Sequence, residues 1–359
     1  MTRAAAPDPG PEARHRARDL GILPGELATG RLNAITDVPG VLVGHETVDH
    51  PADLHTGVTA VLPHDGNVFR ERVRAGLSVG NGFGKLVGAT QLYELGELET
   101  PIVLTGTLSA FRVADALVSY ILDLPGNEQV RSVNPVVGET NDGYLSDGRR
   151  RPLTEAHVRR SIESARGGAV AEGCVGAGAG TMCFGWKGGI GTASRSVALE
   201  GGTATLGALV QSNFGGALRV LGAPIAAELP APSRVQTAGS CMIVVATDAP
   251  LDSRQLSRLA RRAVFGLARV GSAYSHGSGD YAIAFSTERV ESNARIADDA
   301  LSPLFAAALE AVEESVLNSL FMATTTGGRD GHEAQALPLP ELVAACRRHG
   351  VPARLPDRA

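Results

Sequence analysis

The feature that most constrains the fold is a strand, a helix and a second strand that follow one another in the last third of the chain. Cys241 to Thr247 is a near-continuous run of strand formers. From Ser253 to Val270, leucines and alanines fall on one face and arginines mostly on the other, which predicts an amphipathic helix. Asp252 and Gln255, three residues apart, are typical of a capping box at its start. Tyr281 to Thr287 is the second predicted strand.

Other segments also show strand or helix patterns. Residues 33–62 hold short β-branched runs that are split by turn residues, which predicts hairpins. Phe111 to Leu124, and a segment that begins at Ser302, have apolar residues at helical spacing. In residues 1–18, Pro, Ala and charge alternate without a face to bury, so we expect a disordered tail there. Because no internal repeat or long linker divides residues 19–359, we expect them to form a single domain.

The composition disfavours several classes of function. A net charge of −5 gives no electrostatic reason to bind nucleic acid, and aromatic residues, at 4%, are too few for a base-stacking surface. The four cysteines form no pair or histidine spacing of the kind that holds zinc, so we expect no metal. No window of about 18 apolar residues is free of charge, and the basic start lacks the apolar core of a signal peptide. We therefore expect a cytoplasmic protein with no nucleic-acid or membrane partner.

Glycine-rich and serine motifs suggest other functions but fit them poorly. The segments 80–85 and 176–180 lack the spacing of nucleotide-binding loops. Ser78 lies in a Gly-x-Ser-x-Gly sequence and Ser275 in a looser copy, and both would be nucleophile elbows only on a turn from a strand to a helix. The first runs into a glycine loop, and the second stands between a helix and a strand. A nucleotide site and an α/β-hydrolase triad are therefore disfavoured.

Ser240, directly after Gly239 and before the predicted strand, suggests a different chemistry. A serine hydroxyl is a poor nucleophile until a base takes its proton, and no His or Lys is adjacent in the sequence. If the bond between Gly239 and Ser240 were cut, Ser240 would gain an α-amine whose pKa of about 7.7–8.0 suits a base near neutral pH. The small glycine would let the hydroxyl approach the preceding carbonyl for an N-to-O acyl shift. A simple Gly-Ser turn before a buried strand explains the same two residues.

A resemblance to a known family covers nearly the whole chain. The matching segments are ITDVPGVLVGH at Ile35, NPVVGETNDGYL at Asn134, KGGIGTASR at Lys187, QSNFGG at Gln211, GSCMIVVATDAPL at Gly239, GSGD at Gly277 and ATTTGGRDGHEAQALP at Ala323. In this order they resemble the DmpA/BapA-type family of L-aminopeptidase/D-esterases and β-aminopeptidases. Members are N-terminal-nucleophile serine hydrolases that cleave themselves into two subunits. The resemblance implies an α/β fold, a four-layer αββα sandwich of the type shared with ornithine acetyltransferases, in which Ser240 opens a central strand.

The resemblance also implies the catalytic residues. The chain would be cut after Gly239 into residues 1–239 and 240–359, which releases Ser240 as the nucleophile. Ser278 and Asp280 match residues that lie close to it and tune its hydroxyl and amine by hydrogen bonds. Two further matches belong to the same site. They are Asn213, whose amide helps to stabilise the oxyanion, and Tyr144, which reaches the same site and whose phenol could donate to the intermediate or the leaving group.

The chain departs from the family pattern in a segment that lines the pocket. Aminopeptidase members often read N-G-N-G-E where this chain has Asn81-Gly-Phe-Gly-Lys85. A lysine would repel an ammonium substrate, so amine recognition would need another carboxylate, such as Glu139 or Asp142. We expect Asn81 and Glu139 to bind substrate.

The resemblance, together with these residues, implies a self-processing serine aminopeptidase or amidase. It would release α- or β-amino acyl residues from small peptides, amides or esters, without a cofactor, as a tetramer of cleaved heterodimers. Two alternatives stay open. One is a non-catalytic scaffold member of the fold, and the other is an ω-amide or lactam hydrolase or acyltransferase with the same nucleophile.

Overall fold

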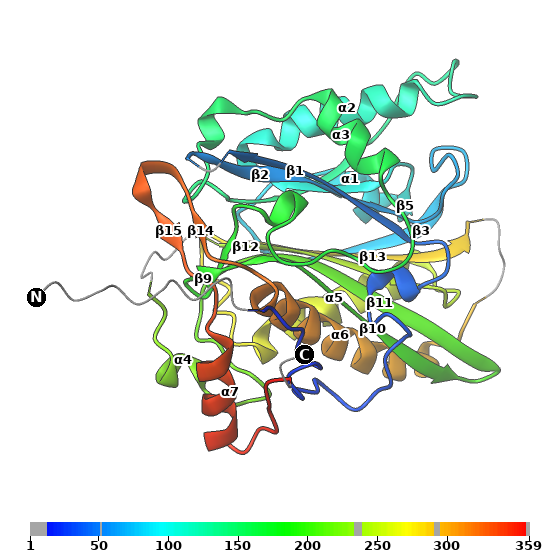
Figure 1. Cartoon of the computed structure of the whole chain (residues 1–359). Helices are drawn as coiled ribbons and strands as arrows, with labels where there is room; N and C mark the ends of the chain where they lie inside the picture. Colours follow the sequence, from blue (N-terminus) through cyan, green and yellow to red (C-terminus); the bar gives the residue numbers. More distant parts are fainter. Residues whose placement is uncertain (1–12, 51, 233–238, 291–294, 357–359) are drawn as a thin grey trace, which may run out of the picture.

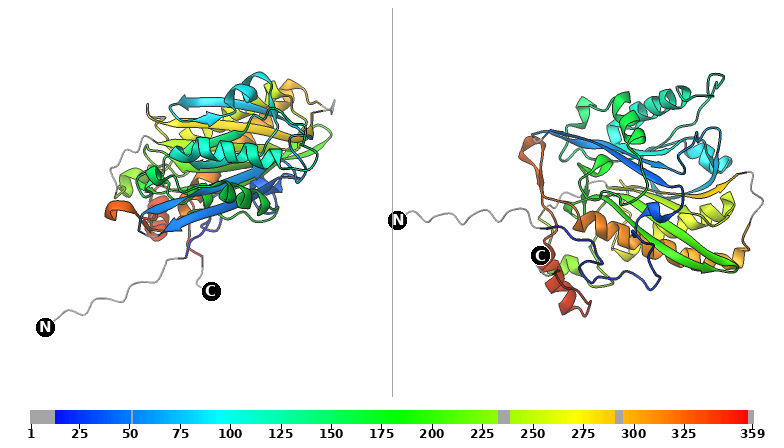
Figure 2. Two further views of the ribbon diagram at one scale, coloured as in Figure 1. Left: turned by 90° about the horizontal axis from the view of Figure 1, so that it is seen from above. Right: turned by 45° about the vertical axis from the view of Figure 1, so that its right-hand side comes forward.

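Two β-sheets lie face to face at the centre of the molecule, and helices cover the outer face of each (Figure 1). The computed structural model of the 359-residue chain describes residues 13–50, 52–232, 239–290 and 295–356. A turned view shows the same order of layers (Figure 2, right). The αββα order predicted from the sequence is therefore confirmed.

Each sheet combines strands from distant parts of the chain. In spatial order, the first sheet contains β1 (Leu42–His50), β2 (Leu54–Leu62), β6 (Ile102–Gly106), β7 (Val136–Thr140) and β4 (Leu86–Val87). The second contains β10 (Gly189–Leu199), β11 (Gly202–Asn213), β12 (Ser240–Thr247), β13 (Gly279–Arg289), β3 (Val73–Gly82) and β5 (Glu97–Leu98). Two short hairpins pair β8 (Met182–Cys183) with β9 (Trp186–Lys187) and β14 (Thr326–Gly327) with β15 (Glu333–Ala334).

Four helices form the two outer layers. They are α2 (Ala110–Leu122) and α3 (Glu155–Glu163) on the first sheet, and α5 (Ser253–Arg269) and α6 (Ser302–Phe321) on the second. Shorter helices are α1 (Ala89–Glu94), α4 (Ile225–Glu228) and α7 (Leu339–Arg348). Short 3-10 turns span Ile35–Asp37, Thr107–Ser109, Gly148–Arg150, Gly176–Gly178, Asp298–Leu301 and Arg329–Gly331. In the part of the chain that is described, no helix is both long and apolar enough to cross a lipid bilayer.

The apolar run in β12 reflects a central strand that is buried on both faces. Successive side chains of a strand point to opposite faces. Cys241, Ile243 and Val245 accordingly join the core beneath α5 and α6, whereas Met242 and Val244 join the core between the two sheets. Because β12 pairs with β11 on one side and with β13 on the other, its backbone is held along its whole length. The first residue of the strand is therefore rigidly placed.

The elements predicted from local sequence patterns form close to their expected limits. The helix predicted from residue 253 is α5, and the backbone N–H of Gln255 donates to the Asp252 side chain at 2.7 Å, as the capping box predicts. The predicted strand at 241–247 starts one residue earlier, at Ser240. The predicted hairpin is β1 and β2, which pair from Leu42 with Leu62 to the turn.

Residues 13–18 differ from the predicted tail, because they lie against α6. The backbone N–H of Ala17, a fully buried residue, donates to Asn318 Oδ1 at 2.9 Å. The guanidinium of Arg18 pairs with the buried Glu314 at 2.9 Å. Arg14 donates to the carbonyl of Phe321 at 2.7 Å. Acceptors on a helix about 300 residues away therefore hold this segment; residues 1–12 lie outside the described residues.

Candidate active site

Three strand ends of the second sheet meet at Ser240. This serine opens β12, and in the sheet register it lies opposite Asn213, the last residue of β11, and Gly279, the first residue of β13. The Gly279 backbone N–H donates to Ser240 Oγ at 3.2 Å, and Ser240 is 5% exposed. A backbone donor therefore orients the hydroxyl at the point where the central strands β12 and β13 begin.

Gly239 sits in a space that no larger residue fits. A Cβ atom at this position would lie 2.4 Å from Phe214 Cα and 2.6 Å from the carbonyl oxygen of Asn213. Both are backbone atoms, which cannot swing aside as the end of a flexible side chain does. The structure therefore requires glycine immediately before the candidate nucleophile. Residues 233–238 lie outside the described residues.

Asn213 presents a buried amide to the same place. Its Oδ1 accepts the backbone N–H of Met182 at 2.9 Å, which fixes the orientation of the side chain. Its Nδ2 has no hydrogen-bond partner among the described residues, although Asn213 is 1% exposed. Directly opposed residues of antiparallel strands point to the same face, so this donor lies beside Ser240. A buried donor without a partner costs stability, and it is the group that a developing oxyanion needs.

Ser278 and Asp280 form the second pair of site residues. Ser278 Oγ donates to Asp280 Oδ1 at 2.8 Å. Burial raises the pKa of Asp280 to about 6, although the hydrogen bond from Ser278 and the nearby backbone of Cys241 oppose the shift. Asp280 lies opposite Cys241 in the register of β12 and β13. A carboxylate that ionises near pH 6 is thus one residue away from Ser240.

Glu139 approaches from the other sheet and is already paired with Lys85. The Lys85 backbone N–H donates to Glu139 Oε1 at 2.8 Å, and its ammonium lies 3.5 Å from the same oxygen. A Cβ atom on Gly84 would lie 3.1 Å from Glu139 Oε1 and 3.2 Å from Gly279 Cα. Glu139 Oε1 and Gly279 Cα therefore lie close to the same face of Gly84, so the predicted acid borders the site.

Asn81 supports the turn that carries Ser278. Its Nδ2 lies within hydrogen-bond distance of three carbonyl oxygens, those of Ser275, His276 and Ser278. The amide nitrogen is thus committed to the protein backbone. The structure gives Asn81 a positioning role, and its contact with substrate stays a prediction.

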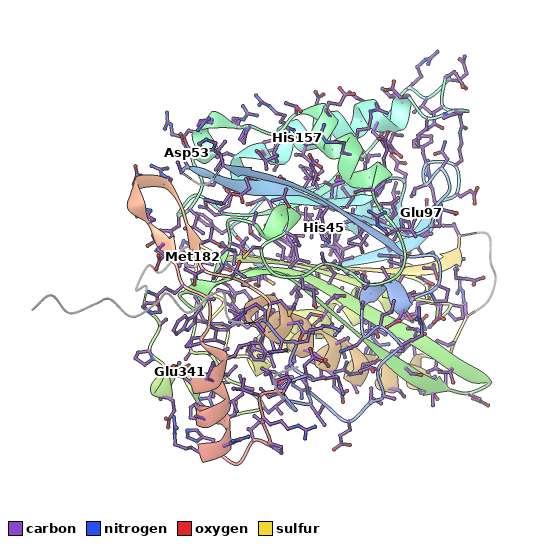
Figure 3. The ribbon with its side chains drawn as sticks, in the orientation of Figure 1. His45, Asp53, Glu97, His157, Met182 and Glu341 are labelled. Carbon is purple, nitrogen blue, oxygen red and sulfur yellow. The ribbon has the colours of Figure 1, made fainter. Side chains whose placement is uncertain are left out.

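Tyr144 lies in a small cluster at the edge of the site. Its ring stacks on His332 with centroids 4.4 Å apart, and it packs with Met182, whose N–H fixes Asn213. Met182 lies on the side of the molecule where β12 begins and β14 and β15 lie (Figure 3). Within the described residues, the Tyr144 hydroxyl makes no hydrogen bond. Its predicted donation to the reaction intermediate or the leaving group therefore stays a prediction.

Two residues near the site escaped the sequence prediction of roles. Lys187 is fully buried, and its ammonium donates to the carbonyls of Gly178 at 3.0 Å and Gly188 at 2.8 Å. Burial lowers the pKa of Lys187, and the nearby Asp142 opposes this shift. Gly279 supplies the N–H that orients Ser240. The rarity of lysine could have pointed to Lys187, because the chain has only two lysines beside 31 arginines.

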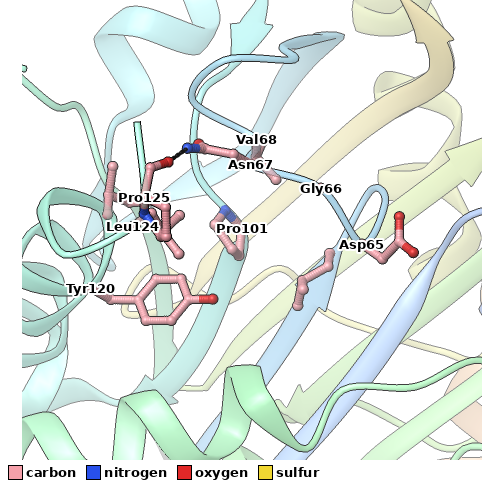
Figure 4. A pocket seen from close by; sticks show the side chains of 10 residues that line it. Asp65, Gly66, Asn67, Val68, Pro101, Tyr120, Leu124 and Pro125 are labelled. Atoms are coloured by element: carbon pink, nitrogen blue, oxygen red, sulfur yellow. Dashed lines mark hydrogen bonds between the residues drawn. The ribbon is translucent and has the colours of Figure 1, made fainter. Parts of the chain in front are cut away.

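The Gly-x-Ser-x-Gly motif, which its sequence context disfavoured as a nucleophile elbow, does not form one. Ser78 is inside β3, and therefore not on a turn from a strand to a helix. A cavity of about 230 Å³ lies between the end of β2 and the end of α2, where Asp65, Pro101 and Tyr120 line it (Figure 4). None of the predicted site residues borders that cavity. Across the described ranges, no cluster of three His, Cys, Asp or Glu side chains is placed to hold a metal ion.

Comparisons with known proteins identify relatives of this chain in sequence and in fold. The sequence profile of peptidase family S58 matches residues 33–334. The β-peptidyl aminopeptidase BapA of Sphingosinicella microcystinivorans is 41% identical, over 93% of this chain and 92% of that protein. Among solved structures, a β-aminopeptidase from Burkholderia sp. is 41% identical with a TM-score of 0.87, over 94% of this chain and 99% of that one.

A second solved structure connects the fold to a mechanism class. The L-aminopeptidase D-Ala-esterase/amidase from Ochrobactrum anthropi is 37% identical with a TM-score of 0.86, over 94% of this chain and 99% of that one. It is described as a prototype for the serine aminopeptidases and a variant of the Ntn hydrolase fold. The family resemblance predicted from the sequence is thereby confirmed. The chain belongs to peptidase family S58 and is a peptide-bond hydrolase with the Ntn fold of the serine aminopeptidases.

Proposed function

We propose that this chain is a self-processing serine aminopeptidase that releases N-terminal α- or β-amino acyl residues from small peptides, amides or esters. The observation that carries the proposal is the pairing of Ser240 with Asn213. A hydroxyl oriented by a backbone donor stands opposite a buried amide nitrogen that has no partner among the described residues. The relatives named β-peptidyl aminopeptidase and L-aminopeptidase support an amine-bearing substrate.

The first step is cleavage of the chain itself. Ser240 Oγ attacks the carbonyl carbon of Gly239, the peptide C–N bond breaks, and an ester forms between the two residues. The hydroxyl proton passes to the departing nitrogen. Water then hydrolyses the ester, which leaves a carboxylate on Gly239 and a free amine on Ser240. The space for glycine alone at position 239 supports this close approach.

The same hydroxyl then acts on substrates. The new amine of Ser240, with a pKa of about 7.7–8.0, accepts the hydroxyl proton as Oγ attacks the substrate carbonyl. Nδ2 of Asn213 donates to the oxyanion, and the ammonium returns the proton to the leaving amine. Water releases the acyl group by the same route. Above about pH 6 the Asp280 carboxylate, with its hydrogen bond from Ser278, stabilises the transient ammonium.

A catalytic member accounts for this arrangement better than a scaffold. Burial of the Asn213 amide nitrogen with no partner in the part of the chain that is described costs stability, and a binding protein gains nothing from that cost. None of the steps above requires a cofactor. A cytoplasmic location and a tetramer of cleaved heterodimers remain parts of this proposal, as predicted from the sequence.

Cleavage and nucleophile are tested together by one comparison. Purified wild type should give two fragments on denaturing electrophoresis, residues 1–239 and 240–359, and the smaller should begin Ser-Cys-Met-Ile. Ser240→Ala should remain one chain and hydrolyse no amino-acyl p-nitroanilide. Ser164→Ala, on the far side of the first sheet after α3, is the matched control and should behave as wild type. An uncut wild type, or turnover by Ser240→Ala, would contradict the proposal.

A further inference from the structure

The two lysines of this chain stand in unusual places. All other basic side chains among its 33 Lys and Arg residues are arginines, so arginine is the default surface cation here. Lys187 is instead fully buried and donates to the carbonyls of Gly178 and Gly188, whereas Lys85 lies beside the acidic group of Glu139. A lysine ammonium is a compact point charge, whereas a guanidinium is a planar fork, so the two are not equivalent at such a site. Lys85 is the one that solvent and substrate can reach, with a side chain that is 42% exposed.

The Lys85 ammonium occupies a defined position on a fixed carboxylate. Its Nζ lies 3.5 Å from Glu139 Oε1 and donates to Thr107 Oγ1 at 2.8 Å. The Glu139 side chain is 2% exposed and is also held by the Lys85 backbone N–H. The Glu139 carboxylate is thus held in place, whereas the Lys85 ammonium ends a flexible side chain. An ion pair with one exposed partner is worth about 1 kcal/mol or less, so the ammonium can be displaced.

The same carboxylate borders the nucleophile. Glu139 Oε1 and Gly279 Cα both lie within 3.2 Å of the point where a Cβ of Gly84 would stand, and the Gly279 N–H donates to Ser240 Oγ. Gly138, next to Glu139, packs on Met242, two residues after Ser240 in β12. The amino group of a substrate bound at Ser240 therefore lies near Glu139. In its protonated form that group is an ammonium, like the Lys85 side chain.

We propose that Lys85 is a specificity-determining residue whose ammonium occupies, on Glu139, the position of the substrate ammonium. This inference rests on the proposed aminopeptidase function. Every amino-acyl substrate must displace Lys85 from Glu139, whereas an acyl group without an amine leaves the Lys85–Glu139 pair intact. The site therefore accepts simple acyl amides and esters alongside amino-acyl ones, with a weaker preference for the amine than an unpaired glutamate would give.

A pair of matched substrates isolates this effect. β-Alanyl p-nitroanilide and propionyl p-nitroanilide have the same acyl chain and differ in the amine alone. In Lys85→Met, the ratio of kcat/KM for β-alanyl over propionyl should rise about two- to fivefold, chiefly through a lower KM for the β-alanyl substrate. Lys85→Arg restores the positive charge and should bring the ratio back toward the wild-type value.

Controls separate this inference from other causes. Arg254→Met, on α5, removes one surface charge that is paired with Asp298 and should leave the ratio unchanged. If Lys85→Met fails to fold, Lys85→Gln provides the same neutralisation with a polar side chain. If wild type is active and the ratio stays constant or falls when Lys85 is replaced by a neutral residue, the proposed role of Lys85 is overturned. The proposed aminopeptidase function is not affected by that result. A wild type that stays uncut and hydrolyses neither substrate overturns the proposed function instead.

Discussion

Asn213 and Ser240 lie directly opposite each other on antiparallel strands, and the Asn213 amide nitrogen is buried without a partner among the described residues. The ladder between β11 and β12 fixes both backbones, and the Met182 N–H fixes the amide. No reorganisation is needed when negative charge develops next to the hydroxyl. Such preorganisation is the usual source of oxyanion stabilisation in hydrolases.

Loss of the Asn213 donor should therefore affect the chemical step. We expect Asn213→Ala to lower kcat by about 10²- to 10³-fold, with a much smaller change in KM. Steady-state kinetics on an amino-acyl p-nitroanilide, with active-site titration, measure this effect. Asn213→Asp keeps an acceptor for Met182 but lacks the donor, so it should also lose kcat. A value of kcat within threefold of wild type in Asn213→Ala would exclude the proposed role.

A methyl group at position 239 should impede cleavage of the chain. Gly239→Ala places Cβ against the backbone of Phe214 and Asn213, which moves the scissile carbonyl away from Ser240 Oγ. The uncut fraction, followed by denaturing electrophoresis after synthesis, should be much larger than in wild type. Gly202→Ala, where a Cβ would meet nothing within 4 Å, is the matched control. Cleavage of Gly239→Ala at the wild-type rate would show that the tight space is irrelevant to processing.

Activity should depend on pH through Asp280. Burial raises the pKa of this carboxyl from 3.8 to about 6, so its charge is lost as the pH falls through 6. The profile of kcat/KM should therefore decline below about pH 6, in addition to the loss caused by protonation of the Ser240 amine near pH 8. In Asp280→Asn the lower inflection should disappear. Persistence of that inflection in the variant would assign it to another group.

The raised pKa of Asp280 also makes the stability of the fold depend on pH. A buried carboxyl with a raised pKa binds its proton more tightly in the folded state, so its contribution to folding is greatest below its ordinary pKa and is lost as the pH rises through about 6. Asp280→Asn should thus gain stability relative to its parent between pH 4 and pH 7. The comparison belongs in the Ser240→Ala background, because the intact chain unfolds as a single molecule.

Local patterns were sufficient to predict the central strand and its helix. The run from Cys241 to Thr247 has no polar face, which is what a strand buried on both sides requires. The start of α5 was predictable because Asp252 and Gln255 satisfy each other within three residues. These features depend on neighbours in the sequence alone.

Long-range pairings were not predictable in the same way. Helix α6 buries Glu310, Glu313 and Glu314, which a helical pattern assigns to solvent, because Arg195 and Arg269 reach them from other elements. The packing of residues 13–18 depends on the same helix, which is remote in sequence. The sequence indicated that Lys85 and Glu139 matter for amine recognition. Their direct contact depends on the pairing of β4 with β7.

The order of strands in the second sheet determines what a cut before Ser240 means for the folded molecule. After such a cut, strands β12 and β13 would belong to the shorter fragment, yet they lie between β11 and β3, which would belong to the longer one. The two pieces are interleaved, so they separate only if both flanking ladders break. Folding must then precede the cut. Once processed, the protein could regain its structure only by a second-order encounter of two chains, so a dilute sample that is denatured after maturation should lose activity permanently.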